Sequence, residues 1–198
     1  MFCITTDPGR AARLLEDDGW VLDAGQAHPG QGTRNRRLVW PEQFFELLWV
    51  TDAAEARANP VRLDRRADWT TTGASPIGLA FRGQLDPADN AEFWLYDALG
   101  PRIFINRDNE RAPERPLVLV LETDDEGVER RRQRLSPVNP HRRPGALREV
   151  RVHGPSAPCL PPCAGSPIAH VPGSHRLELV IAPDGPPRHI TDALTIRG

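Results

Sequence analysis

The sequence has few cysteines, little net charge and no long apolar run. Its three cysteines are an odd number and too few for a disulfide framework, which favours a reducing compartment and a cytoplasmic location. No segment approaches the roughly 20 apolar residues that cross a bilayer, and the start, MFCITTDPGR, does not resemble a targeting segment. A formal net charge of -2 gives no general attraction to nucleic acid or to anionic lipid. We therefore expect neither nucleic acid nor a membrane as a partner.

Motifs of several common enzyme classes are also absent. Without a phosphate-cradling glycine loop, a nucleophile elbow or an HExxH helix, the sequence excludes nucleotide hydrolases, serine hydrolases and zinc proteases of the usual kinds. The chain is instead rich in turn formers, with 21 prolines and 16 glycines among 198 residues, which predicts many loops and short elements. With 39% hydrophobic residues it has enough apolar surface for one substantial core.

The first 52 residues predict the order strand, helix, strand, strand, strand. Asp7 and Pro8 form a helix start, because the carboxylate caps the helix and the proline lacks an N–H that would be unpaired there. Gly19 ends this helix. The predicted strands are residues 2–6, 20–22, 35–40 and 43–50.

The rest of the chain predicts short strands on either side of a polar stretch. Residues 77–82, 102–106 and 117–121 have strand patterns, whereas residues 92–99 fit a strand or a short helix equally well. Charge and proline dominate the stretch before the last four predicted strands, residues 147–153, 168–171, 175–182 and 189–197. We therefore predict a first module with central strands over 1–125, a polar basic linker over 126–146 and a shortened second module over 147–198.

One carboxylate stands out because it lies inside an apolar strand. In an extended run alternate side chains share a face, so Glu46 lies beside Phe44 and Leu48. Burying an ionised carboxylate is costly unless it is paired, hydrogen-bonded or bound to a metal, so such a residue is either held by a partner or functional. Two interpretations remain open at this point, a functional role and a salt bridge to an arginine of the adjoining strand, namely Arg34, Arg36 or Arg37.

An internal similarity supports two related modules. FELLWVTDA (residues 45–53) aligns without a gap with LELVIAPDG (residues 177–185), so that Glu46 matches Glu178 and Asp52 matches Asp184. Duplication of a strand-helix-strand-strand-strand unit would produce such a match.

These segments resemble a known family. HPGQGTRN followed by FFELLWV, together with NPHRRPGALREVRVHGP and RLELVIAPDG, is similar to the glyoxalase-like branch of the vicinal oxygen chelate superfamily. The resemblance implies an α+β, mostly β fold in which paired βαβββ modules form a cupped sheet that holds a divalent metal and a small organic substrate. The second module is expected to have a degenerate helix, because proline-rich PSAPCLPPCAGSP takes its place.

The resemblance also implies site residues. Family members bind metal through a His, Gln or Glu on a module's first strand and a Glu near the end of its fourth strand, where Glu46 and Glu178 fall. The first strand here offers Cys3, Thr5 and Thr6 instead, so a divalent metal stays an open alternative. We predict Glu46 and His28 as catalytic residues, and the candidate metal ligands are Glu46, Glu178 and His28. The predicted substrate-binding residues are Gln31, Thr33, Asn35, Trp49 and Arg107.

Each candidate also has a plain structural alternative. Glu178 fits a solvated residue, His28 a surface-loop histidine, Arg107 a charged connecting loop, and the polar residues after His28 fit turn formers. The residues Cys159, Cys163, His170 and His175 suggest a zinc site, but the spacing is unusual and a plain loop is favoured.

Three functions follow from these patterns. The first is a glyoxalase-like enzyme that acts on a small oxygenated organic substrate, with or without a divalent metal. The second is a metal-free protein that sequesters a drug or metabolite, as bleomycin-resistance members do, with walls supplied by Trp40, Trp49, Trp69 and Trp94. The third is a non-catalytic interaction protein whose cup is closed. In each case we expect a monomer or weak homodimer, and in the first two a small-molecule partner.

Overall fold

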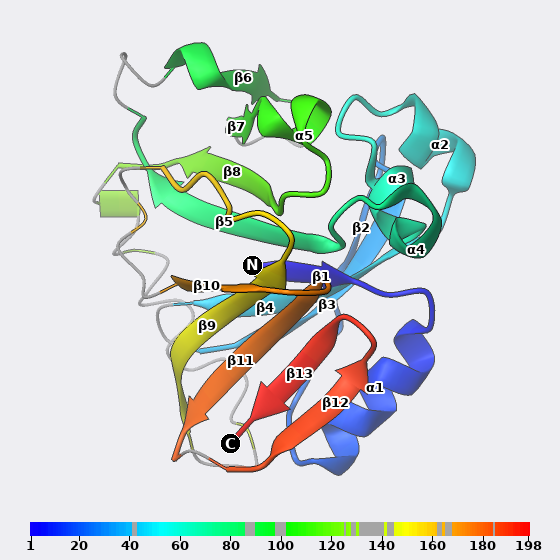
Figure 1. Cartoon of the computed structure of the whole chain (residues 1–198), viewed down its shortest axis with the longest axis vertical. Coiled ribbons are helices and arrows are strands. Elements are labelled where there is room, and N and C mark those ends of the chain that lie inside the picture. Colours follow the sequence, from blue (N-terminus) through cyan, green and yellow to red (C-terminus); the bar gives the residue numbers. More distant parts are fainter. Residues whose placement is uncertain are drawn as a thin grey trace.

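The computed structural model describes residues 1–40, 43–85, 90–97, 102–124, 126–127, 130, 141, 145–161, 164, 168–183 and 185–198. These residues form two β-sheets with short helices around them, as Figure 1 shows. The predicted class, α+β and mostly β with curled sheets, is confirmed. No helix among these residues combines the length and the apolar composition that a bilayer crossing needs.

The larger sheet has eight strands and is built from two modules side by side. Their order is β2-β3-β4-β1-β5-β8-β7-β6. β1 lies parallel to β4, and β5 repeats this arrangement with β8. The modules join where β1 pairs antiparallel with β5. The strands are β1 (Phe2–Ile4), β2 (Gln26–His28), β3 (Thr33–Val39), β4 (Phe44–Val50), β5 (Ile77–Gly83), β6 (Phe93–Tyr96), β7 (Ile103–Asn106) and β8 (Leu117–Glu122).

The smaller sheet has five strands in the order β10-β9-β11-β13-β12. The sequence predicts the second module of the cup after residue 147, but the strands there form this separate sheet, and β5–β8 supply the second module. Local strand patterns do not show with which distant strand a given strand pairs. The pattern of residues 92–99 fitted a strand or a short helix, so β6 was not identified as a strand. The strands are β9 (Ala146–Gly154), β10 (Ile168–Pro172), β11 (Arg176–Ala182), β12 (Pro187–Thr191) and β13 (Leu194–Arg197).

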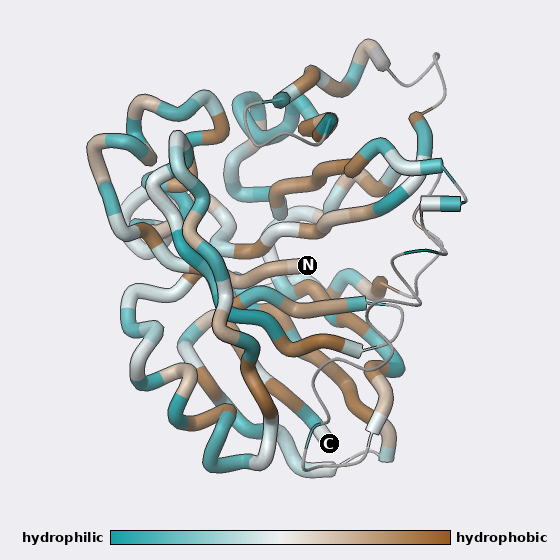
Figure 2. The backbone as a smooth tube through the Cα atoms, turned by 180° about the vertical axis from the view of Figure 1, so that it is seen from behind, coloured by the Kyte–Doolittle hydropathy of each residue, from teal (hydrophilic) through white to brown (hydrophobic). Residues whose placement is uncertain are grey.

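The two sheets share one hydrophobic core. Phe45 and Leu47 of β4 belong to the same buried cluster as Leu177 and Leu179 of β11. The apolar stretches of the strands accordingly lie in the interior in Figure 2, with hydrophilic segments around them. Because alternate residues of a strand face opposite ways, the neighbours of Phe45 and Leu47 face the other side of the larger sheet. No observation tests the division of the chain at 1–125, 126–146 and 147–198, which stays a prediction.

Helix α1 (Pro8–Asp17) begins as predicted. The side chain of Asp7 accepts a hydrogen bond from the backbone nitrogen of Arg10 (2.9 Å), and Leu15 is fully buried on the inner face of the helix. Between β5 and β6 the described residues form only the 3-10 helix η1 (Asn90–Glu92), whereas the degenerate helix was predicted at the proline-rich PSAPCLPPCAGSP, part of which lies outside the described residues. The smaller sheet and α1 together cover the core side of the larger sheet.

Four short helices lie outside the predicted elements. They are α2 (Ala53–Ala58), α3 (Leu63–Ala67), α4 (Trp69–Thr72) and α5 (Asp108–Arg111). Asp52 caps α2 by accepting hydrogen bonds from the backbone nitrogens of Ala54 and Glu55, both at 2.9 Å. Asp52 followed by Glu55 was thus the sequence signal for this helix. Leu63, at the start of α3, reaches the cavity described next.

Candidate functional site

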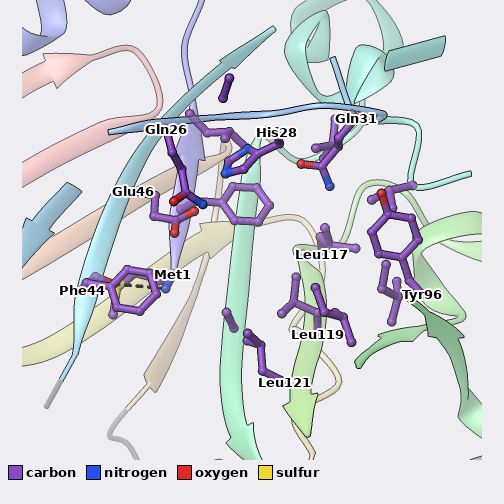
Figure 3. A pocket seen from close by; sticks show the side chains of 18 of the residues that line it. Met1, Gln26, His28, Gln31, Phe44, Glu46, Tyr96, Leu117, Leu119 and Leu121 are labelled. Carbon is purple, nitrogen blue, oxygen red and sulfur yellow. Dashed lines mark hydrogen bonds between the residues drawn. The ribbon is translucent and has the colours of Figure 1, made fainter. Parts of the chain in front are cut away.

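A cavity of about 530 Å³ opens on the face of the larger sheet opposite the shared core. Most of its wall is apolar, and a few polar side chains gather at one end. Figure 3 shows Gln26, His28 and Glu46 together at that end, with the leucines of β8 further along the wall. The apolar residues that line it are Met1, Phe2, Ala27, Pro29, Phe44, Leu48, Val61, Leu63, Ala80, Ile103, Ile105, Leu117, Leu119 and Leu121; Tyr96 lines it as well.

The carboxylate of Glu46 faces this cavity. Phe44 and Leu48 line the same cavity while Phe45 and Leu47 are buried in the core, so the predicted alternation of β4 is confirmed. Within the described residues, the Glu46 side chain makes no hydrogen bond or ion pair. A carboxylate without a hydrogen-bond or ion-pair partner in mainly apolar surroundings is available to a ligand.

The arginines that could have neutralised Glu46 have other partners. Arg37 lies opposite Glu46 in the β3–β4 register, but its Nε donates to Asp23 at 2.6 Å. Arg36 pairs with Glu16 at 2.8 Å. Arg34 lies opposite Trp49, so it is on the face of β3 that points away from the cavity. The salt-bridge alternative for Glu46 is therefore wrong among the described residues.

His28 is held at the polar end by a short chain of hydrogen bonds. Its Nδ1 lies 3.0 Å from the hydroxyl oxygen of Thr33, and that hydroxyl donates to Oε1 of Gln31 at 2.9 Å. Burial lowers the pKa of His28 below its ordinary value; the charge of Glu46 acts in the opposite direction and that of Arg37 in the same one. His28 is therefore a neutral imidazole at neutral pH.

Two glycines shape the strand that carries His28. Gly25 and Gly32 flank β2 and both have positive φ, 66° in each case. A Cβ at Gly25 would overlap the backbone of Asn35, and a Cβ at Gly32 would overlap the backbone of Asp52. Both positions therefore require glycine, and they fold β2 against β3 so that Gln26 and His28 reach the cavity.

Phe2 forms the floor between the two modules. It pairs with Glu46 on one side and with Gly78 on the other. The Phe2 ring occupies the space that a side chain at Gly78 would need. Beside it, the amino group of Met1 donates to the Phe44 carbonyl at 3.2 Å, the dashed line in Figure 3. Burial lowers the pKa of this amino group to about 6, so it carries little charge well above that pH.

The structure brings only some predicted site residues to the cavity. Glu46, His28 and Gln31 line it. Thr33 is 1% exposed and supports His28 from behind, and Asn35 accepts a hydrogen bond from the backbone nitrogen of Gln26 at 3.0 Å, so both have positioning contacts rather than a place in the wall.

Two predicted substrate-binding residues do not line the cavity. Trp49 falls on the opposite side of β4 from Glu46. Arg107 follows β7 and donates from Nε to the Ala91 carbonyl at 3.0 Å. The tryptophans expected as walls, Trp40, Trp49, Trp69 and Trp94, are not part of the described lining either.

Glu178 lies on β11 in the smaller sheet, with three basic partners. It accepts a hydrogen bond from Nε of Arg197 at 3.0 Å and lies 3.2 Å from Nε2 of His153, with Arg151 at 3.8 Å. Burial raises the pKa of this carboxyl, but the hydrogen bonds from Arg197 and His153 outweigh it and hold the pKa below its ordinary value. The solvated alternative for Glu178 is wrong, since the residue is 5% exposed.

The residues at the cavity do not fit a divalent metal. In the family that the sequence resembles, the metal ligands come from the first and fourth strands of each module, which correspond here to β1, β4, β5 and β8. These strands present Phe2, Glu46, Ala80 and the β8 leucines to the cavity, so among these residues Glu46 alone has an atom that could bind a metal. In the described part of the chain no three His, Cys, Asp or Glu side chains come together as a metal would require. Hard cations need several oxygen or nitrogen ligands, so a site with Glu46, His28 and Glu178 is not built here.

The suggested zinc residues do not converge among described residues. Cys159 is exposed and unbonded, whereas Cys163 lies outside the described residues. Nε2 of His170 lies 3.1 Å from the Gly154 carbonyl, and Nε2 of His175 lies 3.2 Å from the Gly73 carbonyl.

Several lining residues could not be found by inspecting the sequence. Tyr96 and the β8 leucines come from the second module, and their strand patterns alone do not show which face meets the first module. Gln26 precedes His28 by two residues on the same strand, which was a usable signal, because residues two apart in a strand share a face.

Comparison with known proteins identifies a matching family and a solved structure with a similar fold. The sequence model of a family described as glyoxalase-like domain matches residues 1–163. A crystal structure of a hypothetical protein from Staphylococcus aureus is similar with a TM-score of 0.59 and 13% identity, over 99% of this chain and 96% of that one. No curated protein matches the sequence.

A second structural likeness is weaker. Methylmalonyl-CoA epimerase from Mycobacterium tuberculosis has a TM-score of 0.42 and 17% identity over 63% of this chain and 86% of that one. A single-residue variant of the Streptomyces coelicolor methylmalonyl-CoA epimerase, in complex with 2-nitronate-propionyl-CoA, has a TM-score of 0.41 and 16% identity over 63% of this chain and 92% of that one.

Proposed function

Since this chain belongs to the glyoxalase-like domain family of the vicinal oxygen chelate superfamily, we propose that it binds a small, largely apolar organic molecule in the cavity of its larger sheet, without a metal. One observation carries this proposal: the wall is apolar except at one end, where Glu46 has no partner among described residues. The volume of about 530 Å³ is within the usual range of ligand sites.

A neutral fluorescent probe of apolar cavities, N-phenylnaphthylamine, tests this proposal. Its fluorescence is expected to rise on addition of the protein and to fall when a competing ligand displaces it. Because Met1 lines the cavity, the protein should carry no N-terminal tag. Ala80→Phe fills part of the cavity and should weaken probe binding about tenfold, since the probe loses most of its contact area on that side.

The matched control is Ala54→Phe, which makes the same change at an exposed position of α2 outside the cavity. This variant should bind the probe like the wild type. Equal binding by the wild type and Ala80→Phe would contradict the proposed site, and a protein that binds no apolar probe would contradict the proposed function.

Proton transfer is a second candidate function. The observation that favours it is the meeting of an unpartnered carboxylate, Glu46, and a neutral imidazole, His28, in one apolar cavity. Such a pair suits removal of a proton from carbon next to a carbonyl group, with Glu46 as the base and His28 as a nearby proton acceptor or relay.

Deuterium exchange separates this candidate from simple binding. A methyl ketone with an apolar body, such as benzylacetone, is incubated with the protein in deuterium oxide, and incorporation next to the carbonyl is followed by NMR. Loss of the base in Glu46→Gln should slow enzymatic exchange by about a hundredfold or more. Exchange no faster than buffer with wild-type protein would remove the proton-transfer function for this substrate class and leave binding.

The interaction-protein alternative required a closed cup, which the cavity contradicts within the described residues. The cytoplasmic location, the small-molecule partner and a monomer or weak homodimer stay predictions.

A further inference from the structure

The position of the proton on His28 follows from its neighbours. A hydroxyl group has one proton to donate, and that of Thr33 donates it to Oε1 of Gln31 at 2.9 Å. Thr33 must therefore accept from His28, whose Nδ1 lies 3.0 Å away. Nδ1 carries the proton, and in a neutral imidazole Nε2 is then left with a lone pair. No described residue forms a hydrogen bond with Nε2 of His28.

The second group at the polar end is also an acceptor. Glu46 is a carboxylate, and Arg37, which lies opposite it in the register, is held by Asp23. Among the described side chains of the lining, Glu46 is the sole acidic one, and burial lowers the pKa of His28. The Met1 amino group also lies in the lining and interacts with the charge of Glu46, but burial lowers the pKa of that amino group to about 6. Well above that pH the amino group is neutral, and a partly buried charge then interacts most favourably with an opposite charge or with hydrogen-bond donors from a ligand.

We infer that the cavity selects ligands whose polar end donates hydrogen bonds, above all primary or secondary ammonium groups on an apolar body, and that it disfavours carboxylates. Glu46 and Nε2 of His28 accept from the ammonium group, while Leu117, Leu119 and Leu121 contact the body. Thr33 is a positioning residue that sets the tautomer of His28. This inference rests on the proposed function, since it names the ligand class of the same cavity.

Three probes with nearly the same skeleton test the ligand class: phenethylamine, phenethyl alcohol and phenylacetate. Dissociation constants are measured by ligand-observed NMR at about pH 8, where the amine is protonated and the amino group of Met1, with its pKa of about 6, is neutral. The wild type should bind the amine about tenfold or more tightly than the alcohol, with phenylacetate weakest.

In Glu46→Gln the preference for the amine over the alcohol should fall by about tenfold and disappear, because the variant loses the charge that favours an ammonium group. Glu92→Gln is the matched control, because it neutralises an exposed carboxylate outside the cavity, paired with Arg111 at 3.2 Å. This control should keep the wild-type order. Equal affinities for amine and alcohol, or tightest binding of phenylacetate, would overturn the ligand class and leave the proposed function standing. Failure of all three probes and of N-phenylnaphthylamine would contradict the proposed function itself.

The tautomer is tested independently by nitrogen NMR of the histidine rings, with His28 assigned through His28→Gln. The wild type should show Nδ1 protonated and Nε2 unprotonated. Thr33→Val keeps the buried volume but removes the acceptor, and should shift His28 towards a mixture of tautomers and lower the preference for the amine. A proton on Nε2 in the wild type would overturn the role assigned to Thr33 and His28.

Discussion

Glu46 and Glu178 occupy matching positions in two similar stretches of sequence, yet their surroundings are opposite. Glu46 faces a cavity with no described partner, whereas Glu178 is enclosed by Arg197, His153 and Arg151. Both stand in apolar strands, β4 and β11. The difference lies in the adjacent strands: β13 and β9 turn basic side chains towards Glu178, but the arginine opposite Glu46 turns away to Asp23.

This difference shows that a carboxylate in an apolar strand does not indicate its own role. Whether such a group is structural or free for a ligand depends on side chains that are distant in sequence and adjacent in the sheet. The pair therefore predicts opposite consequences for the same substitution. Replacing Glu178 should affect folding, and replacing Glu46 should affect binding.

The largest effect on stability is expected for Glu178→Gln. The amide leaves Arg197 and His153 without their charged acceptor, and we expect unfolding free energy to fall by about 2–3 kcal/mol. Chemical denaturation measures this loss. In the control Glu149→Gln, which removes a more exposed pair with Arg151, the loss should stay below about 1 kcal/mol. Equal losses in the two variants would contradict the contrast between buried and exposed carboxylates.

Gly78→Ala should have the next largest effect on stability, and it should also affect the cavity. Its Cβ would overlap the Phe2 ring, so the ring must move towards the cavity. We expect a loss of about 1–3 kcal/mol from overpacking, together with weaker probe binding. Adding Phe2→Leu should restore part of both properties. If the double variant is no better than the single one, the Phe2–Gly78 contact is not the cause.

A smaller effect is expected from pH. The folded state holds the pKa of Glu178 below its unfolded value, so its stabilisation is complete above the unfolded pKa, about 4.3, and is lost as the pH falls through the folded pKa. The stability difference between wild type and Glu178→Gln should therefore shrink on acidification below about pH 4. Denaturation at several pH values measures it, and a constant difference would show that the carboxylate is not stabilised by its partners.

The smallest effect on stability is expected for Glu46→Gln, within about 0.5 kcal/mol, because the folded state gives this carboxylate no described partner to lose. The same denaturation series measures it. A loss comparable with that of Glu178→Gln would mean that Glu46 is a structural residue.

Much of the first module was predictable because its signals are local. The Asp7-Pro8 helix start and the alternation that turns Glu46 and Phe44 to one side follow from neighbours in sequence, as does the buried β8 run of the second module. Glu46, His28 and Gln31 were placed in one site through the family resemblance, and they do line one cavity. The strand expected at residues 20–22 is absent there, and the strand that carries His28 is β2 at Gln26–His28.

The rest depends on long-range pairing. The partner module of the cup could not be chosen from the sequence, since the last strands have equally good β patterns and an internal similarity to β4. The partner of Arg37 could not be chosen either, because both Asp23 and Glu46 are within reach of its strand. Trp49 and Arg107 were expected at the site from residue type alone, which does not specify a face.

The shared core has a consequence for dividing the chain. Leu177 and Leu179 share one buried cluster with Phe45 and Leu47, so a fragment ending after β8 would expose apolar residues of the eight-stranded sheet to water. Truncation at the polar stretch would thus produce an aggregating piece rather than an autonomous binding module. The five-stranded sheet covers the apolar face of the larger sheet that points away from the cavity. Transfer of the cavity to another protein would therefore require both sheets together.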